Sequence, residues 1–158
     1  MRRTDREIKD FSQIVDIMKR CKVCHLCFND EYPYVVPLNF GMEVDNEEVI
    51  LYFHGASEGK KHDLIKKNNK VGFVMENMPS VLTSDIACNS VADFESVMGY
   101  GKVEYVDGEE KEEALQLLMS QYAKPSAKSF EFKPEIINRT CIMKLKVEGL
   151  SAKRLIKK

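Results

Sequence analysis

Residues 51–61 have the sequence LYFHGASEGKK. The first residues are apolar and suit the end of a strand, the glycines and serine suit a tight turn, and the lysines open a helix. The start of a helix exposes unpaired N–H groups and a partial positive charge, which together bind phosphate. Lys60 and Lys61 are unfavourable beside that charge unless an anion lies there. We therefore interpret Phe53–Lys61 as a phosphate-binding segment, with a solvated basic helix face as the alternative.

Upstream, apolar residues alternate with smaller or polar ones over Pro33–Val44, which predicts one strand. The apolar face of this strand carries Tyr34, Val36, Leu38, Phe40 and Met42. Pro37 removes a backbone donor and places the strand at an edge. Asn39 and Gly41, on the opposite face, leave space and an amide for a flat polar ligand. An edge strand with a solvated asparagine is the alternative.

The remaining elements follow from the same periodicities. Helices are predicted from the Asp10 cap to Arg20, over Ser57–Asn68 with Ser57 as cap, and over Glu109–Tyr122 with Ala114, Leu115, Leu118, Met119 and Tyr122 facing inward. Further strands are predicted over Lys22–Phe28, Val49–Phe53, Val71–Glu76, Phe94–Val106 and Thr140–Val147, with loops over Asn77–Ser84 and Lys124–Pro134 and a basic tail over Ser151–Lys158. About six strands and three helices predict a mainly β fold, an antiparallel barrel with peripheral helices, in one domain over residues 1–158.

Composition narrows the class of protein. The 24 basic and 25 acidic residues nearly cancel, so bulk charge gives no reason to expect nucleic acid or an anionic membrane as a partner. No apolar run approaches the roughly 20 residues of a membrane-spanning helix. The N-terminus is charged and lacks the apolar stretch of a secretory signal. Five cysteines fit a reduced compartment, so we expect a cytoplasmic protein.

The chain lacks most local motifs of catalysis. Cys21, Cys24 and Cys27 resemble a zinc knuckle, but no turn residue lies between them and no second pair follows at finger spacing, so we expect no metal. There is no nucleophile elbow, Walker loop or dinucleotide fingerprint. Of the three histidines, His54 is the best candidate for an acid or a substrate contact, although a structural histidine is the commoner case.

Two glycines, Gly99 and Gly101, lie on one face of the predicted strand Phe94–Val106. Glycines at such positions allow a ligand or another backbone to approach closely, and a β-bulge explains them equally well.

The ordered set of segments resembles the pyridoxamine-phosphate-oxidase-like flavin-binding split barrels, and among these the nitroimidazole-resistance proteins. The segments that carry the resemblance are 33–41 (PYVVPLNFG), 51–61, 94–102 (FESVMGYGK) and 151–154 (SAKR). Their order and spacing cover nearly the whole chain. The resemblance implies a six-stranded antiparallel split β-barrel that forms a homodimer with FMN at the subunit interface, FAD being the alternative cofactor.

The resemblance also assigns the site. It places the flavin ring along Val36, Pro37, Leu38, Asn39 and Phe40, and the phosphate beside Phe53, His54, Ser57, Lys60 and Lys61. Ser96 and Gly99 belong to the strand that closes the pocket from the second subunit. His54 would be the catalytic residue.

The implied activity is electron transfer from a reduced nicotinamide to a small acceptor such as a nitro compound. The chain has no tryptophan and lacks the substrate segment of true pyridoxamine-phosphate oxidases, so oxidation of pyridoxamine phosphate is not expected. A flavin- or haem-binding module without turnover is the second hypothesis, and a barrel that binds no cofactor is the third.

Overall fold

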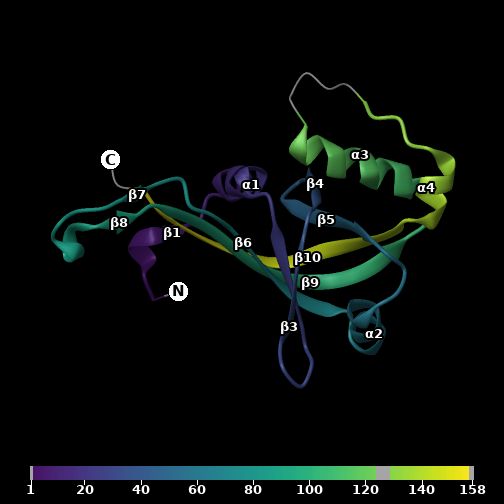
Figure 1. Cartoon of the computed structure of the whole chain (residues 1–158), viewed down its shortest axis with the longest axis horizontal. Helices are drawn as coiled ribbons and strands as arrows, with labels where there is room; N and C mark the ends of the chain where they lie inside the picture. Colours follow the sequence, from purple (N-terminus) through teal and green to yellow (C-terminus); the bar gives the residue numbers. More distant parts are fainter. Residues whose placement is uncertain (1, 124–128, 157–158) are drawn as a thin grey trace.

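A computed structural model describes residues 2–123 and 129–156. Ten strands, four α-helices and two short 3-10 helices form the described part of the chain (Figure 1). The strands are β1 (Glu7–Ile8), β2 (Cys24–Phe28), β3 (Tyr34–Leu38), β4 (Gly41–Asp45), β5 (Glu48–Gly55), β6 (Lys70–Asn77), β7 (Val81–Leu82), β8 (Val91–Ala92), β9 (Phe94–Val106) and β10 (Cys141–Leu155). The helices are η1 (Thr4–Arg6), α1 (Phe11–Arg20), α2 (Lys60–Lys67), η2 (Ala87–Asn89), α3 (Glu110–Tyr122) and α4 (Pro134–Arg139).

The main sheet has the strand order β3-β2-β6-β9-β10-β5-β4, and β1 pairs with β10. Every pairing is antiparallel. The edge strands β3 and β4 do not pair with each other, so the barrel is not closed. The predicted mainly β, antiparallel architecture is confirmed. None of the helices in the described ranges is long and apolar enough to cross a membrane.

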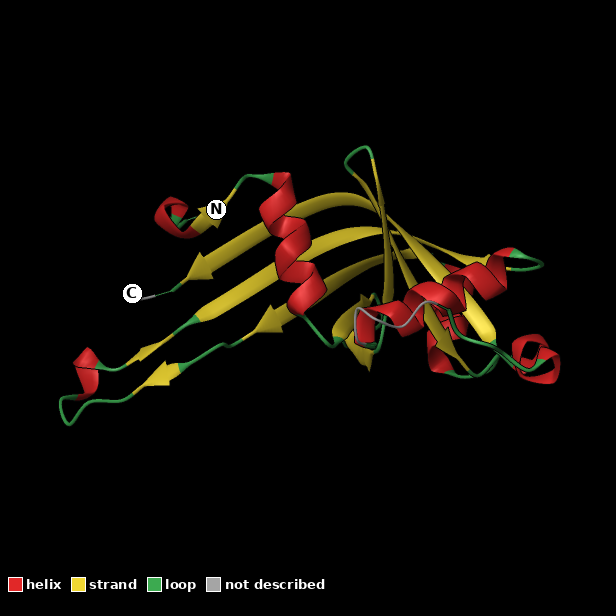
Figure 2. Ribbon diagram, turned by 90° about the horizontal axis from the view of Figure 1, so that it is seen from above, coloured by secondary structure: helices red, strands yellow, loops and turns green. Residues whose placement is uncertain are grey.

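Helices pack against both faces of this sheet, and Figure 2 shows α1 lying across the long strands. On the inner face, α1 and α2 pack their apolar residues against a core that includes Leu26, Phe53, Phe73 and Met143. On the outer face, α3 packs against a smaller cluster at one end of the sheet. There the backbone of α3 lies directly against β4, because a Cβ on Gly41 would fall 2.5 Å from the Leu118 nitrogen.

One predicted strand is two. The alternation over Pro33–Val44 is interrupted at Asn39 and Phe40, where the chain leaves β2 and crosses to β5. The Asn39 amide donates to the Lys22 carbonyl, and the Phe40 N–H donates to the Tyr122 hydroxyl. These partners replace strand pairing at the crossing.

Helix and strand ends differ elsewhere from the prediction. Ser57 does not cap α2, because the helix begins after Gly59, which has φ of 123°. The last strand continues to Leu155 through a bulge between Val147 and Gly149, so most of the predicted tail belongs to β10. The predicted boundaries of β9 and the Asp10 cap of α1 are confirmed.

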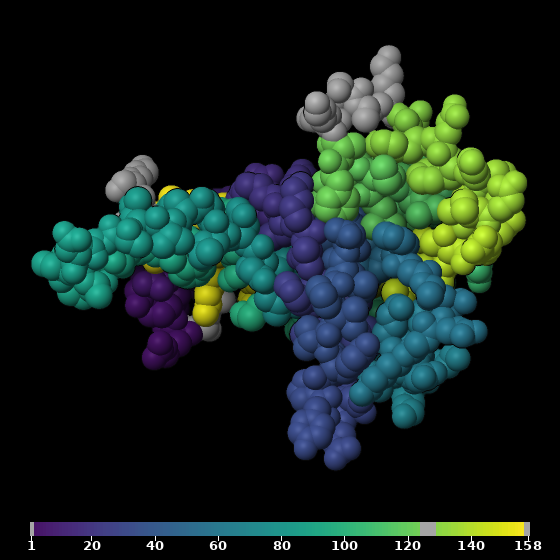
Figure 3. All heavy atoms as spheres, in the orientation of Figure 1, coloured from purple at the N-terminus to yellow at the C-terminus, as the bar shows by residue number. Residues whose placement is uncertain are grey.

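Two further predictions, on the inward face of α3 and on the loop after β6, are wrong in part. Met119 and Tyr122 of α3 are exposed, at 42% and 38%, and not buried. The loop after β6 contains β7, which pairs with β8 in a projecting arm (Figure 3). The predicted loop Lys124–Pro134 ends where α4 begins, and its residues 124–128 lie outside the described part, as do residues 157–158 of the predicted tail.

Candidate functional site

The predicted phosphate segment is a strand end, an exposed turn and the first turn of a helix. β5 ends at Gly55, and residues 56–60 are exposed. Gly59 precedes α2 and offers no side chain to cap it. The N–H groups of His62 and Asp63 bond to the Gly59 carbonyl. The N–H groups at the very start of the helix therefore have no side-chain acceptor and can serve an anion.

The two lysines of this segment point in different directions. The Lys60 ammonium lies 2.7 Å from an Asp30 carboxylate oxygen and 4.9 Å from the centre of the Tyr34 ring. The hydrogen bond from Lys60 lowers the pKa of Asp30. The Lys61 ammonium instead lies over Gly55, 3.4 Å from the position that a Cβ would occupy there. Lys60 therefore brings the phosphate segment next to β3, as the flavin prediction requires.

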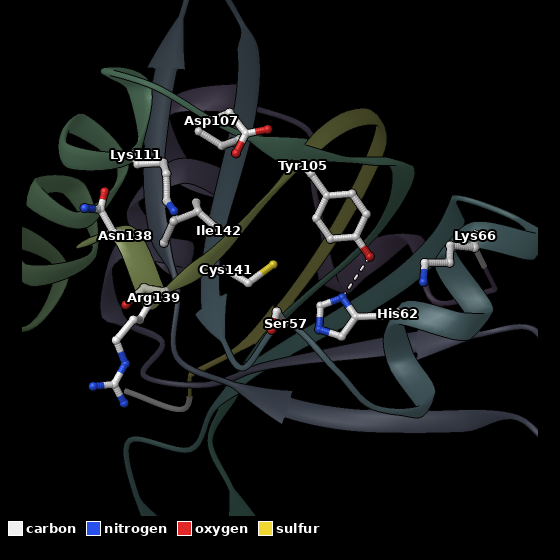
Figure 4. Close-up of a pocket in the computed structure, with 12 residues that line it drawn as sticks. Ser57, His62, Lys66, Tyr105, Asp107, Lys111, Asn138, Arg139, Cys141 and Ile142 are labelled. Atoms are coloured by element: carbon white, nitrogen blue, oxygen red, sulfur yellow. Dashed lines mark hydrogen bonds between the residues drawn. The ribbon is translucent and has the colours of Figure 1, made fainter. Parts of the chain in front are cut away.

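A large cavity with a volume of about 770 Å³ adjoins this segment (Figure 4). It lies between α2, the end of β9, the start of β10 and the neighbouring ends of α3 and α4. Its lining residues are Ser57, His62, Lys66, Tyr105, Val106, Asp107, Lys111, Asn138, Arg139, Thr140, Cys141 and Ile142. Of the predicted site residues, only Ser57 lines it.

His62 is a buried residue of this cavity that the sequence analysis did not single out. Its Nε2 lies 2.8 Å from the Ala56 carbonyl oxygen, and its Nδ1 lies 2.8 Å from the Tyr105 hydroxyl. A carbonyl only accepts, so the neutral ring carries its proton on Nε2 and accepts the Tyr105 proton on Nδ1. Burial lowers the pKa of His62, which favours this neutral form. Its only sequence signal was its position in the helix that follows the phosphate turn.

The predicted ring-binding residues alternate between the two faces of β3. Val36 and Leu38 are half-buried and pack against the core, whereas Pro37 is exposed on the outer face. Phe40 and Phe53 are fully buried in the core, so their side chains are closed to a ligand. The Asn39 side chain is exposed and donates to the Lys22 carbonyl.

The remaining predicted residues lie on β5 and β9. His54 is exposed and pairs with Ile142, so it lies on the outer side of the sheet. Ser96 lies on the outer face of β9 and is half-buried. Gly99 faces inward, where a Cβ would fall 2.5 Å from the Phe73 ring. Its space is therefore filled by this chain's own core.

One chain does not bring all the predicted residues into a single hollow. Ser57 lines the large cavity, Pro37 lines a hollow of about 410 Å³, and Gly99 lines one of about 220 Å³.

Beyond α3, the outer face of the sheet is exposed and largely apolar. Its residues from neighbouring strands are the apolar Cys27, Val35, Pro37, Gly72, Val74, Met98 and Tyr100, with His25 between Pro37 and Val74. Val35, Met98 and Tyr100 are 48%, 41% and 59% exposed. We call this set the outer apolar face. An apolar patch that crosses several strands is typical of an interaction surface.

A family model described as pyridoxamine 5'-phosphate oxidase matches residues 10–154. The chain belongs to this family. The match includes every predicted site residue, the outer apolar face and the large cavity. No curated protein sequence matches the chain significantly.

Several solved structures resemble this chain along most of its length. A protein from Bacteroides thetaiotaomicron, provisionally named a 5-nitroimidazole antibiotic resistance protein, is 30% identical, with a TM-score of 0.79 over 94% of this chain and 86% of its own. The flavocytochrome Anf3 from Azotobacter vinelandii is 20% identical, with a TM-score of 0.80 over 99% of this chain and 72% of its own. The FAD and heme binding protein from Mycobacterium smegmatis is 13% identical, with a TM-score of 0.79 over 96% of this chain and 74% of its own. The last two likenesses concern the fold alone.

Proposed function

We propose that this protein is a homodimeric FMN-dependent oxidoreductase that passes electrons from a reduced nicotinamide to a small acceptor such as a nitro compound. The observation that carries the proposal is the uncapped, lysine-bearing start of α2 beside β3, in a chain whose family match spans residues 10–154. The resemblance to the Bacteroides thetaiotaomicron protein supports the choice of a nitro compound.

The start of α2 fits the phosphate of FMN. Ser57 is exposed, Lys60 and Lys61 supply positive charge, and the first N–H groups of the helix lack a side-chain acceptor. A phosphate monoester carries a charge of about −1.5 to −2 at neutral pH, which these groups can neutralise. Lys60 would exchange its contact with Asp30 for the phosphate, or share its charge between the two.

The isoalloxazine ring would lie on the outer side of the sheet. There Pro37 and the Asn39 amide are exposed, and His54 is exposed at the end of β5. One chain leaves this side open. A second copy that buries the outer apolar face would bring its Ser96 strand toward the ring. Dimer formation thus explains both the exposed apolar surface and the incomplete pocket.

FMN supplies the hydride and electron transfer when it is bound. The protein would orient the ring between β3 and the partner's β9 and exclude water from it. His54 would donate a proton to the acceptor as it is reduced. Full reduction of a nitro group to an amine consumes three molecules of reduced nicotinamide and releases two waters, so the acceptor must have room to turn or rebind between steps.

The absorbance spectrum of the purified protein tests cofactor binding first. Flavin bands near ~370 and ~450 nm, or their appearance on adding FMN, are the expected result. A colourless protein that ignores added FMN contradicts the proposal. If flavin binds, NADH or NADPH should bleach the bands and a nitroaromatic compound should restore them. Bound flavin that no donor reduces, or that no acceptor reoxidises, supports the alternative of a flavin- or haem-binding module without turnover.

A double variant tests whether the lysines at the start of α2 bind the FMN phosphate. Lys60→Ala together with Lys61→Ala should weaken FMN binding at least about tenfold, because each charge-assisted contact contributes roughly 1.5–3 kcal/mol. Fluorescence titration with FMN measures the dissociation constant. Lys67→Ala with Lys70→Ala removes the same charge from exposed positions away from the start of α2 and should leave it unchanged. Equal losses in the two double variants would place the phosphate elsewhere.

A further inference from the structure

The large cavity is bigger and more cationic than a flavin phosphate at the start of α2 requires. Its volume of about 770 Å³ lies in the range of binding sites for whole small molecules. Ser57 is the one residue that it shares with the proposed phosphate site. The other lining residues belong to the far side of α2 and to the ends of β9, β10, α3 and α4.

Three cations line this cavity without an acidic partner. Lys66 comes from α2, Lys111 from α3 and Arg139 from α4, and Figure 4 shows Lys66 on one side of the cavity and the other two opposite. Among the described residues, no ion pair or hydrogen bond engages any of their charged groups.

Four other lysines of the molecule are paired with carboxylates. Lys60, Lys102, Lys144 and Lys146 lie 2.7, 2.8, 2.8 and 3.0 Å from a carboxylate oxygen. The numbers of acidic and basic residues in the sequence differ by only one. Exposed lysines such as Lys19, Lys67 and Lys70 also lack a carboxylate partner among the described residues. What distinguishes Lys66, Lys111 and Arg139 is that all three line one cavity, where an anion could neutralise them together.

The lining defines the chemistry of that anion. Its three cations and the single carboxylate of Asp107 give a formal charge of +2, with His62 neutral. The Asn138 amide adds a neutral donor, and the Ser57 hydroxyl lies at the boundary with the proposed flavin phosphate site. Lysine and arginine donors together are typical of phosphate recognition. A single phosphate group of charge near −2 would neutralise the cavity.

We propose that this cavity binds a small phosphorylated molecule at a site separate from the flavin. Its phosphate lies between Lys66 on one side and Lys111 with Arg139 on the other. The Tyr105 hydroxyl donates to His62, so its oxygen faces the cavity as an acceptor and can receive a hydroxyl or amino proton of the ligand. The ligand is therefore a phosphate ester that also carries a hydrogen-bond donor.

Calorimetric titration of the FMN-loaded protein with inorganic pyrophosphate tests the proposal, because the flavin's own phosphate site is then occupied. We expect saturable binding at about 0.15 M salt, where exposed charges are largely screened. Lys111→Gln and Arg139→Gln should each weaken it about fivefold or more. Neither side chain has a partner in the described fold, so both variants should fold normally.

The matched control is Lys19→Gln, which removes an exposed cation on α1 and should leave pyrophosphate binding unchanged. Three results would overturn the proposal: no saturable binding, an equal loss in the control, or binding that appears only when FMN is removed. The last result would assign the cavity to the flavin itself. If the protein binds no FMN, the same titration on the flavin-free protein still decides the matter, so the two proposals fail separately.

Discussion

His62 is held neutral by its two hydrogen bonds and by burial, and this has a consequence for stability. Burial lowers the pKa of His62 in the folded protein below its ordinary value of about 6.5. The unfolded chain then binds the proton more readily than the folded one. The free energy of unfolding should therefore fall as the pH drops through about 6.5 and on to the folded-state pKa. Above this range the contribution is fully present.

The His62→Gln variant tests this. An amide can still donate to the Ala56 carbonyl but does not titrate, so the variant should lose less stability than the parent between about pH 7.5 and 5.5. Urea unfolding at the two pH values measures the difference. His54→Gln, a change at an exposed histidine, is the control and should keep the parent's slope. Parallel slopes in parent and His62→Gln would show that this histidine is not the group that titrates.

Single residues also show where local sequence rules stop. Asp10 caps α1 as predicted, because cap and helix are adjacent in the chain. Ser57 has the right side chain for a cap, but the helix starts two residues later, after Gly59 adopts a positive φ. His62 could not be assigned from sequence because one of its partners, Tyr105, is 43 residues away.

A buried ionic cluster joins α1 to two strands of the sheet. The Glu95 carboxylate of β9 accepts two hydrogen bonds from Arg20 of α1, at 2.9 and 2.8 Å, and one from Arg154 of β10, at 2.8 Å. Burial alone would raise the pKa of Glu95, but the two arginines lower it further than burial raises it. Its stabilising contribution is therefore present above the ordinary pKa of a glutamate and is lost as the pH falls through the folded-state value.

We expect Glu95→Gln to lower the free energy of unfolding at neutral pH by about 2–4 kcal/mol, because it leaves two guanidinium groups without their carboxylate. The lower end allows for the partial exposure of Arg20 and Arg154. Glu104→Gln breaks an exposed pair with Lys146 and should cost less than about 1 kcal/mol. Urea unfolding of both variants gives the comparison. A similar small loss in each would mean that the cluster does not hold α1 to the sheet.

Strands were predicted well where hydrophobic alternation and strand pairing agree. The limits of β9 follow from its alternation and from the acidic helix start beyond it. The crossing between β3 and β4 was missed because Phe40 fits the alternating apolar pattern of a single long strand. Phe40 is buried in the core whether the chain forms one strand or two, so its burial does not reveal the crossing. What breaks the strand there is a hydroxyl from Tyr122, which is 82 residues away.

The outer apolar face could not be recognised in the sequence, because it takes a few residues from each of several strands. Each strand alone looks like an ordinary half-buried strand. Only the register between β3, β2, β6 and β9 brings these residues together in two neighbouring rows. One row is Val35, Cys27, Gly72 and Tyr100, and the other is Pro37, His25, Val74 and Met98. The predicted homodimer now has a specific surface on which it can be tested.

Val35→Arg should convert the proposed dimer into a monomer and weaken FMN binding in parallel. The charge would lie within the proposed apolar contact and would have to be desolvated without a partner, which costs several kcal/mol. Val44→Arg is the matched control, because Val44 is also an exposed valine on an edge strand. Val44 is 39% exposed and Val35 is 48% exposed, but Val44 lies on β4, at the opposite edge of the sheet. Sedimentation velocity gives the oligomeric state and flavin titration gives the affinity. A parent that is monomeric, or a Val35→Arg protein that stays dimeric with unchanged FMN affinity, would place the subunit contact and the flavin elsewhere.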